Sequence, residues 1–308
     1  MMVKTYQKLK FPHGVHIPIL SGRINNLMKW FQIRTMKKQK LKNNIHTSSD
    51  NNPRIIVSLT SFPARTNIVY WTLKTLLNQT VKVNRIILWL AEEQFSKERL
   101  PQELTEVQDY GVSIRFCDDL RSHKKYYYSM LEYPNDIIIT VDDDIVYPED
   151  TIEKLLKKYE QYPDCVVCNE GREITFNEDK IINRYSFWKK RTTEGAFAPS
   201  SKLVPIGCGG VLYPPHSLDK RLFDKRLIKD LAWFTDDLWL KCMSALNKTM
   251  VVKTDKYSRP LTPINDSQTE SLNSINVNGG NNDLSMKKLI GYFPQIIEFI
   301  QNGSNNIF

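Results

Sequence analysis

The chain has 308 residues, of which 41% are hydrophobic, 11% aromatic and 25% charged. These values are typical of globular proteins and exclude a chain that is disordered throughout. The net charge of +9 is carried by residues 1–49, which hold ten of the 43 Lys and Arg residues and no acid, so that 33 bases face 34 acids in the remainder. Because this remainder is nearly neutral, we expect no nucleic-acid partner.

The N-terminal segment, residues 1–49, combines its basic residues with aromatic ones, as in Leu27-Met28-Lys29-Trp30-Phe31. Such a segment suits the surface of an anionic membrane, and a solvated or partner-docking tail fits equally well. It contains neither an apolar run of the ~18 residues that span a membrane nor the features of a signal peptide. We therefore expect a cytoplasmic protein, with peripheral contact to the inner face of the cell membrane through residues 1–49.

Residues 43–53 are polar and are interpreted as a linker, so we expect an extension at 1–53 and a body at 54–308. From residue 54 onward, short apolar runs alternate with helical patterns, and Asn67 is a candidate helix cap. Runs without period-two alternation indicate parallel strands that are buried on both faces, and hence an α/β fold. Strands are predicted at 55–59, 85–90, 112–116, 136–141 and 165–168, and helices at 68–77, 96–109, 124–132 and 149–161.

Beyond residue 170 this alternation is lost, which divides the body into halves at 54–170 and 171–308. The second half contains a Pro/Gly-rich segment, a long polar loop and two predicted helices. These four stretches are residues 204–215, 258–282, 235–246 and 284–300, respectively.

Three consecutive acids, Asp142, Asp143 and Asp144, follow the fourth predicted strand at its carboxyl end, where open parallel sheets bind ligands. On an extended chain, Asp142 and Asp144 point the same way and Asp143 points elsewhere. Clustered carboxylates repel one another, and a shared Mg or Mn ion relieves that repulsion. An exposed acidic turn that caps the helix beginning near Pro148 is the structural alternative.

The stretch from Ile137 to Pro148, in this succession of strands, resembles the DxD region of bacterial family-2-like GT-A glycosyltransferases of surface polysaccharide synthesis, and the similarity covers roughly residues 54–250. The resemblance implies a single GT-A domain, with a nucleotide-binding first half and an acceptor-binding second half. It also implies metal-dependent transfer of a hexosyl group from a nucleotide-sugar, UDP-linked, to a hydroxyl of a glycan or lipid-linked glycan. Asp144 would bind the Mn or Mg ion, and Asp142 would reach the ion or the ribose.

Candidate donor-binding residues follow the first, third and fourth strands. Those after the first strand are placed to hold the base or ribose, although a plain loop fits as well. In similar enzymes the region after the third strand contacts the nucleotide, and a solvated charged loop is the alternative there. The candidates are Thr60, Ser61, Arg65, Asp119, Lys124, Asp142 and Asp143.

Asp236 and Asp237 begin a predicted helix and resemble the acidic pair from which inverting family-2 enzymes take their catalytic base. By position the base is Asp237, and the predicted inversion of configuration rests on this assignment. Favourable interaction with the helix dipole is the structural alternative. The glycines of residues 206–211 suit close approach of a sugar, and residues 278–283 suit a lid over the donor.

All five histidines precede Asp237, whereas many GT-A enzymes complete the metal site with a C-terminal His. Donor phosphates and water would complete it here, or an Asn or Asp near residue 282.

The Cys165 and Cys168 pair has zinc-site spacing but lacks a second pair. Rival interpretations are a haloacid dehalogenase-like phosphatase with Asp142 as nucleophile, whose domain would open with that motif, and a non-enzymatic membrane- or polyanion-binding module.

Overall fold

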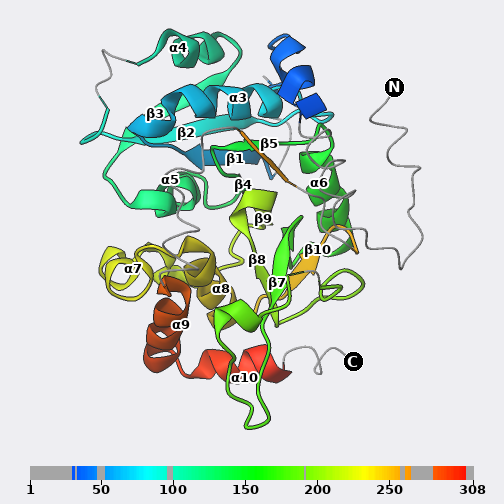
Figure 1. Cartoon of the computed structure of the whole chain (residues 1–308), viewed down its shortest axis with the longest axis vertical. Coiled ribbons are helices and arrows are strands. Elements are labelled where there is room, and N and C mark those ends of the chain that lie inside the picture. Colours follow the sequence, from blue (N-terminus) through cyan, green and yellow to red (C-terminus); the bar gives the residue numbers. More distant parts are fainter. Residues whose placement is uncertain are drawn as a thin grey trace.

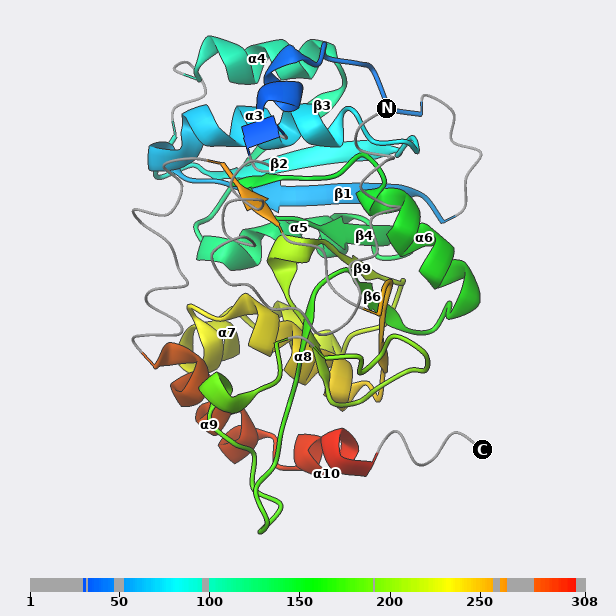
Figure 2. The ribbon, with the colours of Figure 1, turned by 45° about the vertical axis from the view of Figure 1, so that its right-hand side comes forward.

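The computed structural model describes residues 30–31, 33–46, 53–95, 100–190, 192–256, 261–264 and 280–302. Its centre is a seven-stranded sheet in the order β10-β6-β9-β4-β1-β2-β3. Figure 1 labels these strands except β6, which is labelled in Figure 2. All neighbours pair in parallel except β9, which runs antiparallel to both β4 and β6. The strands are β1 (Ile55–Thr60), β2 (Arg85–Ala91), β3 (Val112–Cys117), β4 (Ile137–Thr140), β6 (Val166–Cys168), β9 (Val211–Tyr213) and β10 (Val251–Lys253).

Two small sheets flank this central one. Strand β5 (Ile145–Val146) pairs with β11 (Thr262–Pro263), and β7 (Gly171–Glu173) pairs with β8 (Leu203–Pro205), both antiparallel. The predicted α/β fold with a mostly parallel sheet is confirmed. The continuously apolar strands are the reason, since each buries side chains on both faces of the sheet.

Helices cover both faces of the central sheet. On one face, α3 (Thr66–Leu76), α4 (Gln102–Asp109) and α6 (Thr151–Gln161) pack on apolar residues of β1, β2 and β4. On the other, α5 (Lys124–Glu132), α7 (Lys225–Ala232) and α8 (Asp236–Leu246) pack with β6 and β9. The last helices, α9 (Asn281–Tyr292) and α10 (Gln295–Asn302), lie beyond α7 and α8 in Figure 2. No described helix is long and apolar enough to cross a membrane.

Three helix predictions need correction. Asn67 is not a cap, because a 3-10 turn at Pro63–Arg65 leads directly into α3, which begins at Thr66. The helix predicted at 96–109 begins at Gln102, directly after Pro101; residues 96–99 lie outside the described ranges. The single final helix is two helices, because Pro294 lacks the N–H that would continue α9 into α10.

The folded body begins before residue 54. Ile45 forms a bridge with Val83, and the Asn44 side-chain amide donates hydrogen bonds to the carbonyls of Gln79 and Val81. Met36 is buried, so the described part of the predicted extension packs on the domain. Membrane contact through residues 1–49 stays a prediction; within that segment, the described Trp30 is half exposed.

Candidate functional site

The site lies at the carboxyl edge of the parallel strands. Ser58 of β1 is in register with Thr140 of β4, so the segments that follow these strands leave the same edge side by side. Thr140 also pairs with Val211, the first residue of the antiparallel β9. The chain therefore enters β9 from this edge, which brings the Pro/Gly-rich segment of the second half to the acids of the first.

The acidic run forms a turn. Asp143 accepts hydrogen bonds from the Ser61 hydroxyl at 2.6 Å and from Arg65 at 2.7 Å, and Arg65 also lies 3.3 Å from Asp144. Strand β4 ends at Thr140, so the acids lie in a turn rather than on an extended strand, and the Arg65 guanidinium contacts both Asp143 and Asp144. Whether Asp142 and Asp144 face one metal ion stays a prediction. Burial raises the pKa of Asp143, although Arg65 and Ser61 oppose this. This turn is largely buried, with Asp143 5% and Asp144 7% exposed.

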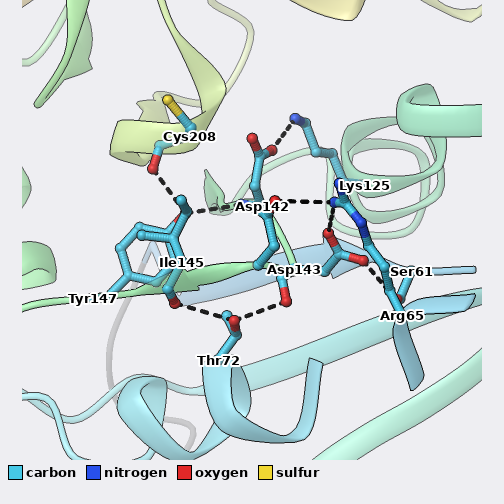
Figure 3. A network of polar contacts seen from close by, with 10 residues as sticks. Ser61, Arg65, Thr72, Lys125, Asp142, Asp143, Ile145, Tyr147 and Cys208 are labelled. Atoms are coloured by element: carbon cyan, nitrogen blue, oxygen red, sulfur yellow. Dashed lines mark hydrogen bonds and ion pairs between the residues drawn. The ribbon is translucent and has the colours of Figure 1, made fainter. Parts of the chain in front are cut away.

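Asp142 is the most open of the three acids, with 31% of its side chain exposed. Its carboxylate accepts a hydrogen bond from Lys125 at 2.7 Å, and its backbone N–H donates to the Tyr147 hydroxyl. That hydroxyl in turn donates to the carbonyl of Cys208 at 3.0 Å. As Figure 3 shows, Asp142 thus points away from the Ser61 and Arg65 side of the turn. It is tied to helix α5 and to the segment before β9.

Lys125 joins the two predicted acidic motifs. Its ammonium lies 2.7 Å from Asp142 and 2.8 Å from Asp236, and its side chain is only 5% exposed. Burial opposes its charged form, yet Asp142, Asp236 and Asp237 raise its pKa well above the usual value. Lys125 is therefore a permanent cation between the first half and helix α8.

Asp236 and Asp237, at the start of α8, have pKa values that are shifted in opposite directions. Burial would raise the pKa of Asp236, but Lys125 outweighs it and holds that pKa below the usual range. Burial, then the charges of Asp236 and Asp142, raise the pKa of Asp237 to about 8, against the pull of Lys125. Asp237 accepts a hydrogen bond from the Gly207 N–H at 3.0 Å. Two adjacent carboxyls with opposite shifts are typical of sites that move protons.

Gly207 lies where these groups converge. It belongs to the short 3-10 turn Gly207–Gly209 that precedes β9. A Cβ at this position would lie 2.8 Å from the Lys125 ammonium, 3.0 Å from an oxygen of Asp237 and 3.5 Å from an oxygen of Asp142. The backbone thus approaches the charged groups at a distance that a side chain would prevent.

The remaining predicted donor-binding residues engage other partners. The Thr60 hydroxyl donates to the carbonyl of Trp89 on the neighbouring strand β2. Asp119 is paired with the buried Lys124 and also accepts a hydrogen bond from Gln94. Among the described contacts, none links these three predicted residues to the acidic turn. Their roles toward a nucleotide stay predictions.

Lys125 and Tyr147 are the site residues that sequence reasoning missed. Lys124 and Lys125 are adjacent, and the choice between them depends on the rotation of helix α5, which places the second one against Asp142. Two adjacent lysines at the start of a Tyr-rich helix are the available signal. No sequence signal points to Tyr147, whose hydroxyl links two distant segments.

The donor set fits a hard divalent cation in part. Of the five acids of this site, the described ion pairs join four, Asp142, Asp143, Asp144 and Asp236, to Arg65 and Lys125, and Asp237 accepts a hydrogen bond from the Gly207 N–H. This excess of carboxylate oxygens favours Mg or Mn. In the described parts of the chain, however, no three His, Cys, Asp or Glu residues form a candidate metal cluster. Substrate phosphates and water would have to complete the coordination.

Two other metal predictions concern residues away from this edge. Asp283, at the start of α9, accepts a hydrogen bond from the backbone N–H of Tyr185, and Asn282 is buried. Neither has a described contact with the acidic turn; residues 265–279, which hold part of the predicted lid, lie outside the described ranges. Cys165 and Cys168 are buried in the packing on opposite faces of the sheet, as expected of structural thiols rather than a zinc site.

Comparison with known proteins gives one family match. The model of the family described as Glycosyl transferase family 2 matches residues 67–221. No curated protein matches the chain significantly in sequence.

Similar solved structures include a mannosyltransferase, PcManGT from Pyrobaculum calidifontis, in complex with GDP-Man and Mn2+. Its TM-score is 0.49 at 12% identity, over 90% of this chain and 76% of that chain. A second is CMP:2-keto-3-deoxy-manno-octonic acid synthetase complexed with CTP, with a TM-score of 0.41 at 12% identity over 75% of this chain and 100% of that chain. At these TM-scores neither structure bears on the activity of this chain.

Proposed function

The chain belongs to glycosyl transferase family 2, and from this premise we propose that it is a metal-dependent, inverting hexosyltransferase. The donor is a nucleotide-sugar, UDP-linked, and the acceptor is a hydroxyl of a glycan or lipid-linked glycan. The setting in bacterial surface polysaccharide synthesis rests on the resemblance of residues 137–148 to such enzymes. Family membership argues against the phosphatase with Asp142 as nucleophile and against a purely binding module.

The observation that carries this proposal is the meeting of two acidic motifs at one point. Oxygens of Asp142 and Asp237 both lie within 3.5 Å of the position of a Cβ on Gly207. One motif follows a strand of the nucleotide-binding half, and the other begins a helix of the acceptor-binding half. A donor held by the first would therefore present its anomeric carbon close to the second.

The chemistry assigns one role to each acid. Asp237 takes the proton of the acceptor hydroxyl as that oxygen attacks the anomeric carbon, and the bond from this carbon to the diphosphate breaks on the opposite side. A base with a pKa of about 8 is well matched to this step near neutral pH. Asp142 and Asp144 would hold the cation, which supplies charge neutralisation for the leaving diphosphate. Lys125 and Arg65 keep these carboxylates in place.

The test measures nucleoside diphosphate release over a panel of nucleotide-sugars with Mn and a glycan acceptor. We expect Asp237→Asn to lower kcat about 100-fold or more, because general bases contribute about that factor, with little change in KM for the donor. Asp144→Asn should instead raise the Mn concentration needed for half-maximal activity.

Asp109→Asn, in the exposed face of α4, is the matched control and should leave both quantities unchanged. Thermal unfolding of each variant verifies that the fold is retained. Full activity in Asp237→Asn or Asp144→Asn would remove that residue from the mechanism.

A further inference from the structure

Arg172, in the second half of the chain, has no carboxylate partner among the residues that the structure describes. It lies in β7, and its Nη1 atom is buried with no hydrogen-bond partner. Its guanidinium stacks on the ring of Tyr185, with the central carbon 4.5 Å from the ring centroid. Among the described residues, no acid forms an ion pair with it, whereas Arg65 is paired with two. An unpaired charge in such a place is unfavourable unless a ligand neutralises it.

The strand pairing places Arg172 next to the segment that holds the proposed base. In the β7 and β8 pair, Arg172 is in register with Val204, and the Ile206 N–H donates to the carbonyl of Glu170. The residue after Ile206 is Gly207, whose N–H binds Asp237. Arg172 is therefore two residues from Glu170, whose partner Ile206 directly precedes the glycine that contacts Asp237.

Tyr185 is held in place by its neighbours. Its ring packs on Trp188 with centroids 4.9 Å apart, and its backbone N–H donates to Asp283 at 2.7 Å. Burial raises the pKa of its hydroxyl to about 12, so the hydroxyl stays neutral. The Arg172 guanidinium thus stacks on a fixed, neutral ring.

We propose that Arg172, stacked on Tyr185, forms an anion subsite that receives a carboxylate or phosphate group of the glycan acceptor. The inference rests on the proposed function and names the acceptor class: a glycan with an acidic group near the hydroxyl that is glycosylated. A planar guanidinium matches either anion with two parallel hydrogen bonds, and stacking on an aromatic face fixes its plane. The acidic group would orient the acceptor so that its hydroxyl faces Asp237.

The experiment compares three probes in NMR titrations of the full chain: methyl glucuronide, glucose 6-phosphate and neutral methyl glucoside. We expect the wild type to bind one of the acidic probes at least tenfold more tightly than the neutral one. A preference for the glucuronide identifies a carboxylate-bearing acceptor, and a preference for the sugar phosphate identifies a phosphate-bearing one. Equal binding of all three probes would overturn the proposal.

Variants locate the subsite. Arg172→Gln should abolish the preference for acidic probes, and Arg172→Lys, which keeps the charge without the planar fork, should retain part of it. Arg184→Gln, an exposed arginine near Tyr185 in sequence, is the matched control and should bind like the wild type. An undiminished preference in Arg172→Gln would overturn the proposal, and Arg172→Lys carries the test if the glutamine variant fails to fold.

A second measurement separates this inference from the proposed function. Hydrolysis of the nucleotide-sugar by water, followed as Mn-dependent diphosphate release without acceptor, needs no anion subsite and should be unchanged in Arg172→Gln. A raised donor KM in that variant would place the guanidinium on the donor and overturn the subsite. If the wild type releases no diphosphate from any donor, the proposed function fails while the probe titrations still report on anion binding.

Discussion

Two sets of cations, one in each half of the molecule, are held differently. In residues 54–170, Lys125, Lys124 and Arg65 each contact at least one carboxylate. In residues 171–308, Lys241 and Lys253 are fully buried, and their ammonium groups donate to the backbone carbonyls of Ser201 and Thr192. Among the described residues, neither of these two lysines forms an ion pair with an acid.

Cations bound to carboxylates and lysines bound only to carbonyls differ in what they do for the fold. Paired cations fix the direction of the carboxylates around them, and in the first half those carboxylates are the proposed metal and donor ligands. A buried lysine bound only to carbonyls is stabilised less, and burial lowers the pKa of Lys241 to about 7. It ties α8 to the segment before β8 at a cost in stability. Three substitutions test this contrast.

Lys125→Met should have the largest effect, because it leaves the buried Asp236 and the partly exposed Asp142 without their cation. Removing one partner of a buried ion pair costs about 3–5 kcal/mol, so we expect a loss of that size in urea unfolding and a decrease of more than tenfold in diphosphate release. Lys125→Arg should recover part of both. Lys157→Met removes an exposed lysine that is paired with Glu153, and this control should unfold like the wild type. A fully stable Lys125→Met would show that the junction does not depend on charge.

Gly207→Ala should have an intermediate effect and act on catalysis more than on stability. The added Cβ would lie 2.8 Å from the Lys125 ammonium and 3.0 Å from Asp237, so both groups must shift. Small displacements of catalytic groups lower rates strongly, and we expect about a tenfold decrease in kcat. The control is Gly291→Ala in α9, where a Cβ meets nothing within 4 Å and kcat should not change. Equal kcat in the two variants would contradict the assigned geometry.

Lys241→Met should have the smallest effect and the opposite sign. The pKa of Lys241 is about 7 in the folded protein and 10.5 in the unfolded chain, so the unfolded chain binds more protons between these two pH values. Burial of the charged lysine therefore destabilises the fold fully below pH 7, and this destabilisation is gone above pH 10.5. We expect the variant to be more stable by about 1–2 kcal/mol at pH 7, with the gain largely lost by pH 10. Thermal unfolding at several pH values measures this, with the exposed Lys229→Met as control. A gain that does not change with pH would mean that packing, rather than charge, is responsible.

The order of strands and helices in the first half could be predicted from the sequence because buried parallel strands are continuously apolar. The bounds of α5, Lys124–Glu132, were predicted to the residue. The predicted helix at 284–300 includes Pro294, so the break between α9 and α10 was missed. Because proline lacks a backbone N–H and interrupts helices, the sequence does contain the signal for this break.

The roles of the predicted site residues stay predictions, and their side-chain contacts could not be derived from the sequence. The two acidic motifs lie close together in the structure, because Lys125 contacts both Asp142 and Asp236. The turn that pairs Asp143 with Asp144 on Arg65 depends on where β4 ends, which apolar patterning does not fix. Lys125 and Gly207 come from segments far apart in the chain, and their meeting with Asp237 depends on the packing of α5, α8 and the entry to β9.

The place of β9 also determines how the two halves can change independently. Residues 171–308 supply this strand, and it lies between β4 and β6, both of which residues 54–170 supply. A cut at residue 170 would remove a strand from the middle of the sheet and leave β6 without either of its neighbours, β9 and β10. The two halves therefore share one sheet, and exchange of the second half between related chains would have to preserve β9 while varying the loops around it.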